Sequence, residues 1–164
     1  MTKTLYIARH GKSSWDFENI ADIDRPLSTR GVNNAYTMAE RLRAKGMIPE
    51  LLISSPASRA LHTAVIYIRT LDLPWESLKI NERIYYESAN EILETIEQID
   101  DNYSSIMVIG HNPAFTELAN SLLQQPVDNI PTAGIVTIVF PTGQWKSIRK
   151  VKTEKEDFDY PKKQ

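Results

Sequence analysis

Short apolar runs alternate along this chain with longer stretches in which apolar residues recur every three or four positions. Three runs have the length of buried strands, at residues 5–8, 51–53 and 106–109, and a weaker one lies at 78–80. The intervening stretches carry apolar residues at helical spacing, within 32–42, 60–71, 92–99 and 115–122. This alternation predicts an α/β fold in which a mostly parallel sheet is covered by helices on both faces.

The expected helices have recognisable ends. Ser28 is a typical N-cap for the first helix, and Gly46 is a typical stop. In Ser55-Pro56 and in Asn112-Pro113, a capping residue precedes a proline, as at the first turn of a helix. The third helix begins at a Ser88–Glu91 capping box. These signals predict helix starts after each of the apolar runs.

Two further apolar segments lie near the C-terminus. Residues 135–140 and 145–151 are predicted as strands joined by a hairpin at 141–143, which adds an antiparallel edge and completes a three-layer α/β/α sandwich. Residues 152–164 alternate in charge and lack a periodic apolar face, so we expect them to fray or lie along the surface. The sequence therefore predicts one domain over residues 1–151 and a charged tail over 152–164.

Reactive side chains follow three of the predicted strands. Arg9 and His10 end the first run, Arg59 follows the second at a helix start, and His111 ends the run at 106–109. The carboxyl ends of parallel strands meet at one edge of a sheet, where ligands bind, and helix N-termini favour anions. Guanidinium groups grip phosphate oxygens in bidentate fashion. These residues therefore predict a phosphate pocket.

The roles within this pocket can be assigned from chemistry. His10 is the preferred nucleophile because Gly11 lets the backbone turn tightly and approach the ligand. Neighbouring cations such as Arg9 should keep its imidazole neutral near pH 7. His111 is expected to donate a hydrogen bond to the phosphoryl oxygens in the transition state.

The amino-acid composition excludes several kinds of chemistry and of binding partner. The 164 residues include no cysteine, which excludes disulfides, thiolate zinc sites and cysteine-based phosphatase chemistry. Nineteen basic and 21 acidic residues give a formal charge of -2, so we expect no binding to nucleic acid or to an anionic membrane. No apolar run approaches the roughly 20 residues that span a bilayer, and the first residues lead into a strand instead of a signal peptide. A cytoplasmic location is the resulting expectation.

Four ordered blocks of the chain resemble the histidine phosphatase superfamily, which has a phosphoglycerate mutase-like fold. The blocks are Arg9-His10-Gly11, residues 25–31, Ser54-Ser55-Pro56 with Arg59-Ala60 and Thr63-Ala64, and Gly110-His111-Asn112-Pro113. Within the superfamily, residues 12–15 and 22–26 are most similar to the small SixA-type phosphohistidine phosphatases. The resemblance implies a phosphohistidine intermediate on His10, with Arg9, Arg59 and His111 completing the phosphate pocket.

The chain departs from the mutase branch of that superfamily. Lys12 and Asp16 stand where mutases usually carry an acidic residue and an asparagine, and residues 80–106 leave little room for the insertion that holds the mutase general acid. Glu87 and Asp16 are the remaining candidates for an acid. An alkoxide leaving group needs a proton donor far more than an imidazole does. The missing insertion also removes a lid, which leaves the pocket open to a phosphorylated protein.

The expected activity is that of a metal-independent, cofactor-free hydrolase in signal transduction. Its expected substrate is phosphohistidine in a protein, such as a histidine phosphotransfer domain. A phosphomonoesterase acting on a small phosphate ester is an alternative of the same superfamily. A non-catalytic module that binds a phosphorylated ligand is an alternative of another class, since it would use the same arginines.

Other polar and aromatic residues receive less definite assignments. Ser13 is expected to reach a phosphate oxygen. His62 is expected to have a structural or surface role, since no metal-ligand spacing supports a zinc site shared with His10 and His111. Three further groups of residues receive a choice between two roles or a structural role. The first group, Trp15, Tyr85 and Tyr86, either rims the pocket or packs in the fold. The second, Asp22 and Asp24, is expected to cap backbone, with proton donation as the alternative. The third, Arg25 and Arg30, is expected to pair with carboxylates.

Overall fold

A six-stranded sheet forms the middle layer of the computed structural model, which describes residues 1–163. Its order is β3-β2-β4-β1-β5-β6. The first four strands are parallel to one another, β5 is antiparallel to β1, and β6 is antiparallel to β5. The strands are β1 (Lys3–Arg9), β2 (Leu51–Ser54), β3 (Leu78–Ile80), β4 (Ser105–Gly110), β5 (Ile135–Phe140) and β6 (Lys155–Asp159). The mostly parallel sheet with an antiparallel edge is therefore confirmed.

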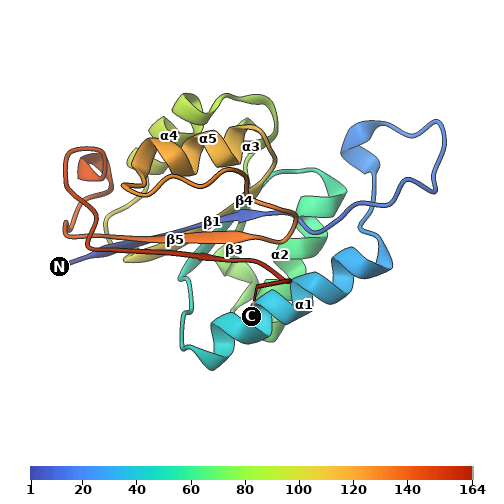
Figure 1. Ribbon diagram of the computed structural model, residues 1–164, viewed down its shortest axis with the longest axis horizontal. Coiled ribbons are helices and arrows are strands. Elements are labelled where there is room, and N and C mark those ends of the chain that lie inside the picture. Colours follow the sequence, from blue (N-terminus) through green and yellow to red (C-terminus); the bar gives the residue numbers. More distant parts are fainter. Residues whose placement is uncertain (164) are drawn as a thin grey trace.

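Helices cover both faces of this sheet (Figure 1). The helices are α1 (Thr29–Ala44), α2 (Ser58–Thr70), α3 (Arg83–Tyr86), α4 (Ala89–Glu97) and α5 (Ala114–Leu122), with short 3-10 turns η1 (Asp22–Asp24), η2 (Trp75–Ser77) and η3 (Trp145–Ser147). Successive residues of β1 point to opposite faces, so Leu5 and Ile7 join the core under α4 and α5, whereas Tyr6 and Ala8 join the core under α1 and α2. The three-layer sandwich predicted from the sequence is thus confirmed.

The predicted helix ends are largely confirmed. The Ser28 hydroxyl accepts a hydrogen bond from the Gly31 amide, the Ser88–Glu91 capping box forms, and Gly46 adopts a positive φ of 68° beyond α1. Two helices begin later than predicted, α2 at Ser58 and α5 at Ala114. In both places the proline lies in the turn that precedes the helix.

The prediction of a strand over residues 145–151 is wrong. Trp145 and Ile148 are buried, and their separation of three positions suits one helical turn instead of a strand. The Trp145 indole Nε1 donates to the Tyr103 carbonyl, and its amide donates to the Asp101 side chain. The segment therefore packs against one end of the core, and the hairpin predicted at 141–143 does not form.

The antiparallel partner of β5 is β6, which lies inside the predicted tail. Ile135 pairs with Asp159 and Val139 with Lys155, so this strand is an edge of the sheet and does not fray. Arg41 fastens the segment that follows, since its guanidinium donates to the Asp159 carboxylate and to the Tyr160 and Pro161 carbonyls. Charged residues suit an edge strand that solvent reaches. The boundary at residue 151 is therefore wrong, and position 164 lies outside the described residues.

No helix within residues 1–163 is long and apolar enough to cross a membrane.

Candidate active site

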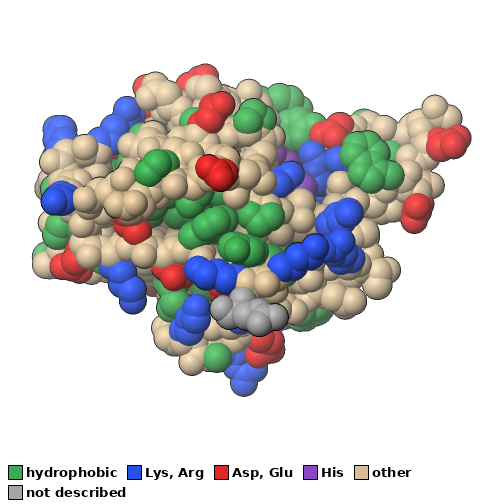
Figure 2. Space-filling view, in the orientation of Figure 1, with side chains coloured by type: hydrophobic (Ala, Val, Ile, Leu, Met, Phe, Trp, Pro, Cys, Tyr) green, Lys and Arg blue, Asp and Glu red, His purple; other side chains and the backbone are tan. Residues whose placement is uncertain are grey.

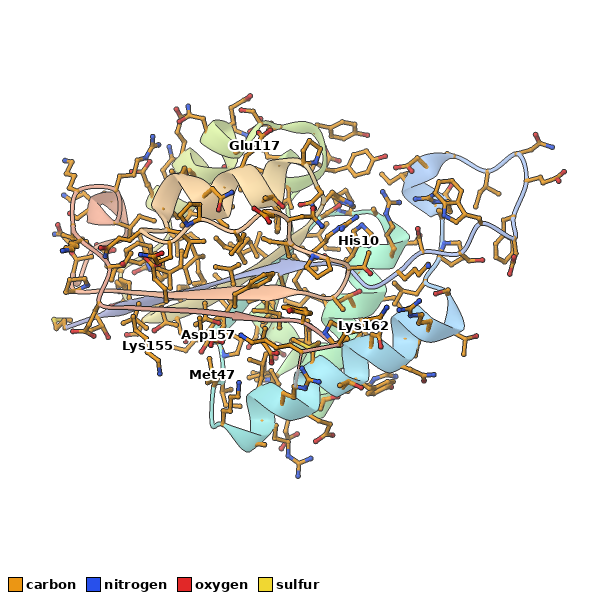
Figure 3. All side chains as sticks on the ribbon, viewed as in Figure 1. His10, Met47, Glu117, Lys155, Asp157 and Lys162 are labelled. Atoms are coloured by element: carbon orange, nitrogen blue, oxygen red, sulfur yellow. The ribbon has the colours of Figure 1, made fainter. Side chains whose placement is uncertain are left out.

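The carboxyl ends of β1, β2 and β4 bring the predicted site residues together. Arg9 and Gly110 are partners in the parallel register of β1 and β4, which places His10 and His111 next to each other. Their ring centroids lie 5.0 Å apart, and Arg59 Nη2 lies 3.4 Å from His111 Nδ1. Figure 3 shows His10 at the end of the sheet farther from Lys155. We call Arg9, His10, Arg25, Arg59 and His111 the histidine–arginine cluster.

The imidazole of His10 is held in one orientation by the main chain. His10 is 6% exposed, and its Nδ1 lies 2.6 Å from the Gly11 carbonyl oxygen. A carbonyl only accepts, so Nδ1 carries the proton and Nε2 keeps its lone pair. The free nitrogen is the one that a nucleophilic role requires.

His10 is also kept neutral. Burial lowers the pKa of His10 to about 4, and the charges of Arg59, Arg9 and Arg25 act in the same direction, although the hydrogen bond to Gly11 opposes them. The sequence predicted the direction from the neighbouring cations, but burial is the larger cause. At pH 7 the lone pair on Nε2 is therefore available.

His111 has the opposite tautomer. Its Nε2 lies 2.7 Å from the Ser55 hydroxyl oxygen, and its Nδ1 faces Arg59, which can only donate. Nδ1 is therefore the acceptor, and Nε2 donates to Ser55. Burial, with the charges of His10 and Arg59, lowers the pKa of His111 to about 3. The donation to a phosphoryl oxygen expected of His111 requires a proton on Nδ1, which an incoming dianion would favour, and this role stays a prediction.

Each arginine of the cluster has a hydrogen-bond donor without a partner. The Nε atoms of Arg9, Arg25 and Arg59 are buried and make no hydrogen bond within the described residues. Buried polar groups are normally paired, and an unpaired one costs free energy. The charges of Arg9, Arg25 and Arg59 all act on His10, so these cations and the two neutral imidazoles together form a site suited to a tetrahedral oxyanion.

Asp22 is a member of the site whose contact with Arg59 sequence analysis did not identify. Its carboxylate accepts from Arg59 Nη2 at 2.9 Å and from the Tyr85 hydroxyl at 2.7 Å, and its carbonyl accepts from Arg59 Nη1. The hydrogen bond from Tyr85, together with Arg59, lowers the pKa of Asp22. The residue is therefore a charged partner of Arg59 at neutral pH, not the backbone cap that the sequence suggested.

Close backbone packing fixes the loop that carries His10. A Cβ atom on Gly11 would lie 2.7 Å from the Gly31 carbonyl oxygen, and one on Gly31 would lie 2.1 Å from the Lys12 carbonyl oxygen. The Thr63 hydroxyl accepts from the Gly11 amide and donates to the Arg59 carbonyl. The loop after β1 is thus locked against the first turns of α1 and α2, which explains why glycine stands at both positions.

The carboxylates considered as general acids lie apart from the imidazoles. Glu87 pairs with Arg83 at 2.9 Å, and Asp16 is exposed. Neither makes a hydrogen bond with the His10 or His111 side chain within residues 1–163. Their role as acids stays a prediction without support from the geometry.

Three further residues considered from the sequence, Ser13, Tyr85 and Arg25, can be placed in the structure. Ser13 is buried beside Leu27 through a single β-bridge, and its contact with phosphate stays a prediction. Tyr85 borders the site, with its ring centroid 5.3 Å from that of His111. Arg25 pairs with Asp22 as expected, at 3.6 Å, and its charge also reaches His10.

Residues 1–163 contain no group of three or more His, Asp or Glu side chains placed to hold a metal ion. His62 is exposed on α2, in agreement with the expected surface position.

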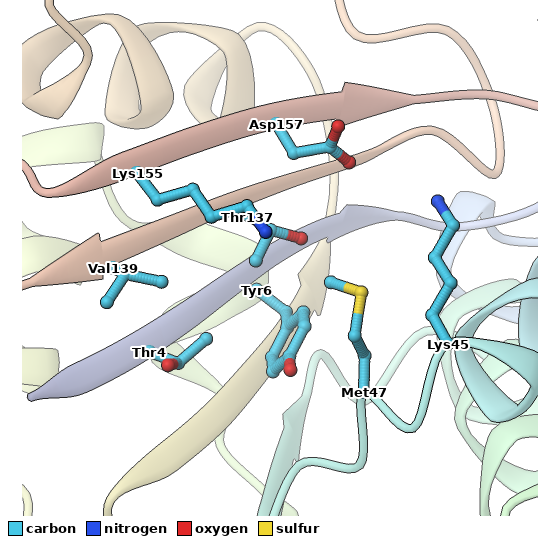
Figure 4. Close-up of a pocket in the computed structure, with 8 residues that line it drawn as sticks. All are labelled: Thr4, Tyr6, Lys45, Met47, Thr137, Val139, Lys155 and Asp157. Atoms are coloured by element: carbon cyan, nitrogen blue, oxygen red, sulfur yellow. The ribbon is translucent and has the colours of Figure 1, made fainter.

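A hollow of about 360 Å³ lies elsewhere, on the sheet face beside the C-terminal end of α1 (Figure 4). Its walls come from β1, β5, β6 and the turn after α1. The lining residues are Thr4, Tyr6, Lys45, Met47, Thr137, Val139, Lys155 and Asp157. None of the residues predicted to handle phosphate belongs to it.

Comparisons with known proteins agree with this geometry. The family model of the histidine phosphatase superfamily (branch 1) matches residues 5–84. An uncharacterized protein of Mycobacterium tuberculosis (strain ATCC 25618 / H37Rv) is 29% identical over 150 residues, which cover 85% of this chain and 90% of that protein. Phosphoglycerate mutase 1 of Saccharomyces cerevisiae is 36% identical over 87 residues, which cover 49% of this chain but only 35% of the mutase.

Solved structures share the whole fold. A protein of Nakamurella multipartitia, named provisionally as the phosphohistidine phosphatase SixA, has a TM-score of 0.84 at 18% identity, covering 99% of this chain and 98% of the other. The protein histidine phosphatase SixA complexed with tungstate has a TM-score of 0.78 at 22% identity, covering 96% and 97%. At these identities the likeness shows the fold alone, whereas the family is shown by the sequence match across the first histidine and Arg59. This chain belongs to the histidine phosphatase superfamily.

Proposed function

We propose that this protein hydrolyses phosphohistidine in another protein through a covalent phosphohistidine intermediate on His10. The observation that carries the proposal is a neutral, oriented imidazole beside three arginines whose charges act on it. A nucleophile and an oxyanion site side by side are what phosphoryl transfer requires.

In the first step, His10 Nε2 attacks phosphorus while the bond from phosphorus to the substrate nitrogen breaks. The substrate imidazole leaves as a neutral ring when its second nitrogen already carries a proton. The new intermediate bears phosphorus on Nε2 and a proton on Nδ1, and the Gly11 carbonyl stabilises the positive charge that develops on this ring. In the second step, water attacks phosphorus, and His10 departs as the neutral imidazole with which the cycle began.

The arginines supply the charge that phosphoryl transfer needs. Arg59 is 5% exposed and reaches the cluster from the first turn of α2, where the helix dipole adds positive potential. Arg9 is held from the other side by the Ile130 carbonyl, which accepts from its Nη1 at 3.0 Å. Fixed donors of this kind stabilise the transition state without having to reorganise.

The leaving group favours phosphohistidine over a phosphate ester. No carboxylate within residues 1–163 is hydrogen-bonded to either imidazole, and the Asp22 carboxylate is held ionised by Tyr85 and Arg59. An alkoxide departs poorly without a proton donor, whereas imidazole is a far better leaving group. A site without a committed acid therefore supports the phosphoramidate as substrate.

A small phosphate ester is the second candidate substrate. Its support is the sequence match to a phosphoglycerate mutase over 87 residues, about half of this chain. If this alternative is correct, the chain hydrolyses free sugar phosphates as fast as it hydrolyses a phosphohistidine protein.

The test is a parallel assay of phosphate release, with EDTA present, from four substrates: a histidine phosphotransfer domain phosphorylated with phosphoramidate, a phosphohistidine peptide, p-nitrophenyl phosphate and a sugar phosphate, whose alkoxide leaving group requires a proton donor. We expect the phosphohistidine substrates to turn over faster, and activity to persist in the chelator. Equal or faster turnover of phosphate esters would support the second candidate. Binding of the phosphoprotein without any release would identify a non-catalytic module.

A further inference from the structure

A segment with exposed apolar side chains projects from the molecule beside the histidine–arginine cluster. It runs over residues 15–24, between the loop after β1 and α1, and is the blue segment extending at the right of Figure 1. Trp15 is 77% exposed, Phe17 56% and Ile20 40%. Single exposed apolar residues are common, but three within six positions next to a reactive site mark a contact surface. We call residues 15–24 the acidic lobe, for the charges described below.

The acidic lobe is physically continuous with the cluster. The guanidinium carbon of Arg25 lies 3.6 Å from the centroid of the Trp15 ring, and the charge of Arg25 acts on His10. Asp22, within the lobe, pairs with Arg59. A protein surface in contact with Trp15 would therefore lie over the cluster.

A further exposed aromatic residue, outside the acidic lobe, lies next to the cluster on α3. Tyr86 is 71% exposed, and its ring packs edge-on against Tyr85 with centroids 4.7 Å apart. Tyr85 in turn contacts His111. Apolar contact area thus adjoins both His10, through Arg25 and Trp15, and His111, through Tyr85.

The charge of the lobe indicates the chemistry of its partner. Residues 15–24 contain four acidic residues and no Lys, Arg or His, namely Asp16, Glu18, Asp22 and Asp24. Figure 2 shows acidic (red) and hydrophobic (green) side chains together on this projection, next to the histidine (purple) and basic (blue) side chains at its base. Such a surface complements one that is apolar and basic.

We propose that the acidic lobe and Tyr86 dock a folded protein that presents its phosphohistidine within an apolar surface flanked by Lys or Arg. This inference rests on the proposed function and deepens it, because it assigns the choice of protein over small phosphate esters to particular residues. The phosphoryl group itself is bound by the arginines, whatever carries it. The lobe acts only on substrates large enough to touch Trp15, Phe17 and Ile20.

The experiment compares variants of the lobe on a large and a small substrate. Phe17→Ala/Ile20→Ala is the first variant, since neither side chain makes a polar contact or supports an arginine. Trp15→Ala and Tyr86→Ala are tested separately. Trp75→Ala is the matched control, because Trp75 is 57% exposed in η2, outside the lobe and the cluster. The substrates are the phosphorylated histidine phosphotransfer domain, taken from a panel of basic and acidic domains, and p-nitrophenyl phosphate.

We expect the double variant to lower kcat/KM on the basic phosphoprotein about tenfold, chiefly through KM. On p-nitrophenyl phosphate it should stay within about twofold of the wild type, as should Trp75→Ala on both substrates. Asp16→Lys/Glu18→Lys should reverse the preference between basic and acidic domains. The far-ultraviolet circular dichroism and melting temperature of each variant verify that it is folded.

Equal losses on both substrates, or no loss on any phosphoprotein of the panel, would overturn the docking inference while leaving the proposed function in place. A wild-type enzyme that releases no phosphate from any phosphohistidine substrate would instead overturn the proposed function and the docking inference with it. The two failures are thus separated by the activity of the wild type.

Discussion

The histidine–arginine cluster and the acidic lobe adjoin each other, yet their side chains are held in different ways. In the cluster, His10 and Arg59 are at most 6% exposed, and main-chain atoms or buried hydroxyls fix their orientation. In the lobe, Trp15 and Phe17 stand mostly in solvent. The side chains of the cluster are preorganised in the absence of a ligand, whereas the lobe has apolar surface area that only a partner can bury.

This contrast separates two tasks within one site. A prepared set of donors recognises any phosphoryl group, because the oxygens are the same in every phosphate ester or phosphoramidate. Discrimination among carriers has to come from surface outside the donors. Changes in the cluster should therefore affect every substrate alike, and changes in the lobe should affect only large ones.

The largest expected effect comes from removing the proposed nucleophile, His10. His10→Ala should lower turnover of every substrate by about 10⁴-fold or more, because no other imidazole in the cluster has a free Nε2. Trapping with a labelled phosphoprotein should yield an acid-labile, base-stable phosphoryl group on the wild type and none on the variant. His62→Ala is the matched control, as His62 is exposed on α2. Substantial turnover by His10→Ala would mean that the cluster binds phosphate but does not carry it covalently.

Arg59→Ala should have the next largest effect. Removing the guanidinium that faces His111 should lower kcat/KM by about 10²–10³-fold on the protein and on p-nitrophenyl phosphate. Arg59→Lys should recover only part of this, since an ammonium lacks the bidentate fork. Arg69→Ala, on the exposed side of the same helix, serves as the control. A loss confined to the phosphoprotein would place Arg59 with the lobe instead of the cluster.

Most of the cluster could be predicted from the sequence because it follows from topology. Parallel strands end at one edge of the sheet, so residues that directly follow β1, β2 and β4 had to meet, whatever the details of the loops. Thr63, on α2, and Asp22, in the loop before α1, contribute through contacts that the strand order does not fix. Asp22 and Arg59 are 37 positions apart, and nothing in the local pattern around Asp22 indicates that its loop folds back onto α2.

The C-terminal region was misassigned for a related reason. The apolar residues Trp145 and Ile148 suggested a strand, but they fill one end of the core from a single helical turn. The strand that closes the sheet, β6, consists largely of charged residues because it is an edge. A pattern of apolar residues indicates which side chains are buried. An edge strand that is held by Arg41 and by backbone hydrogen bonds buries few side chains, so this pattern does not reveal it.

The pH dependence of the cluster gives a third prediction. Burial keeps the pKa of His10 near 4, so nuclear magnetic resonance of its ring should show the neutral Nδ1–H tautomer at pH 7 and down to about pH 5. The unfolded chain takes up this proton below about pH 6.5, and the folded protein does not until about pH 4. The free energy of unfolding should therefore be highest above pH 6.5 and fall as the pH approaches 4. Urea denaturation should show a smaller fall for His10→Asn. Titration of the His10 ring near pH 6.5 would contradict the picture of a buried, neutral nucleophile.

The smallest predicted effect concerns Asp22, which belongs to the lobe by sequence and to the cluster by contact. Its carboxylate is ionised at neutral pH, since the hydrogen bond from Tyr85 lowers its pKa, and it pairs with the guanidinium of Arg59. A phosphoryl oxygen that approaches Arg59 therefore competes with this carboxylate. Asp22→Asn keeps an oxygen for Tyr85 and Arg59 but removes the charge, so inorganic phosphate should inhibit the variant about two- to fivefold more strongly, as expected for a partly exposed ion pair. Asp24→Asn, in the same turn, should leave inhibition unchanged. Weaker inhibition of Asp22→Asn would show that the carboxylate positions Arg59 for phosphate. Asp22 would then belong to the preorganised cluster and not to the lobe.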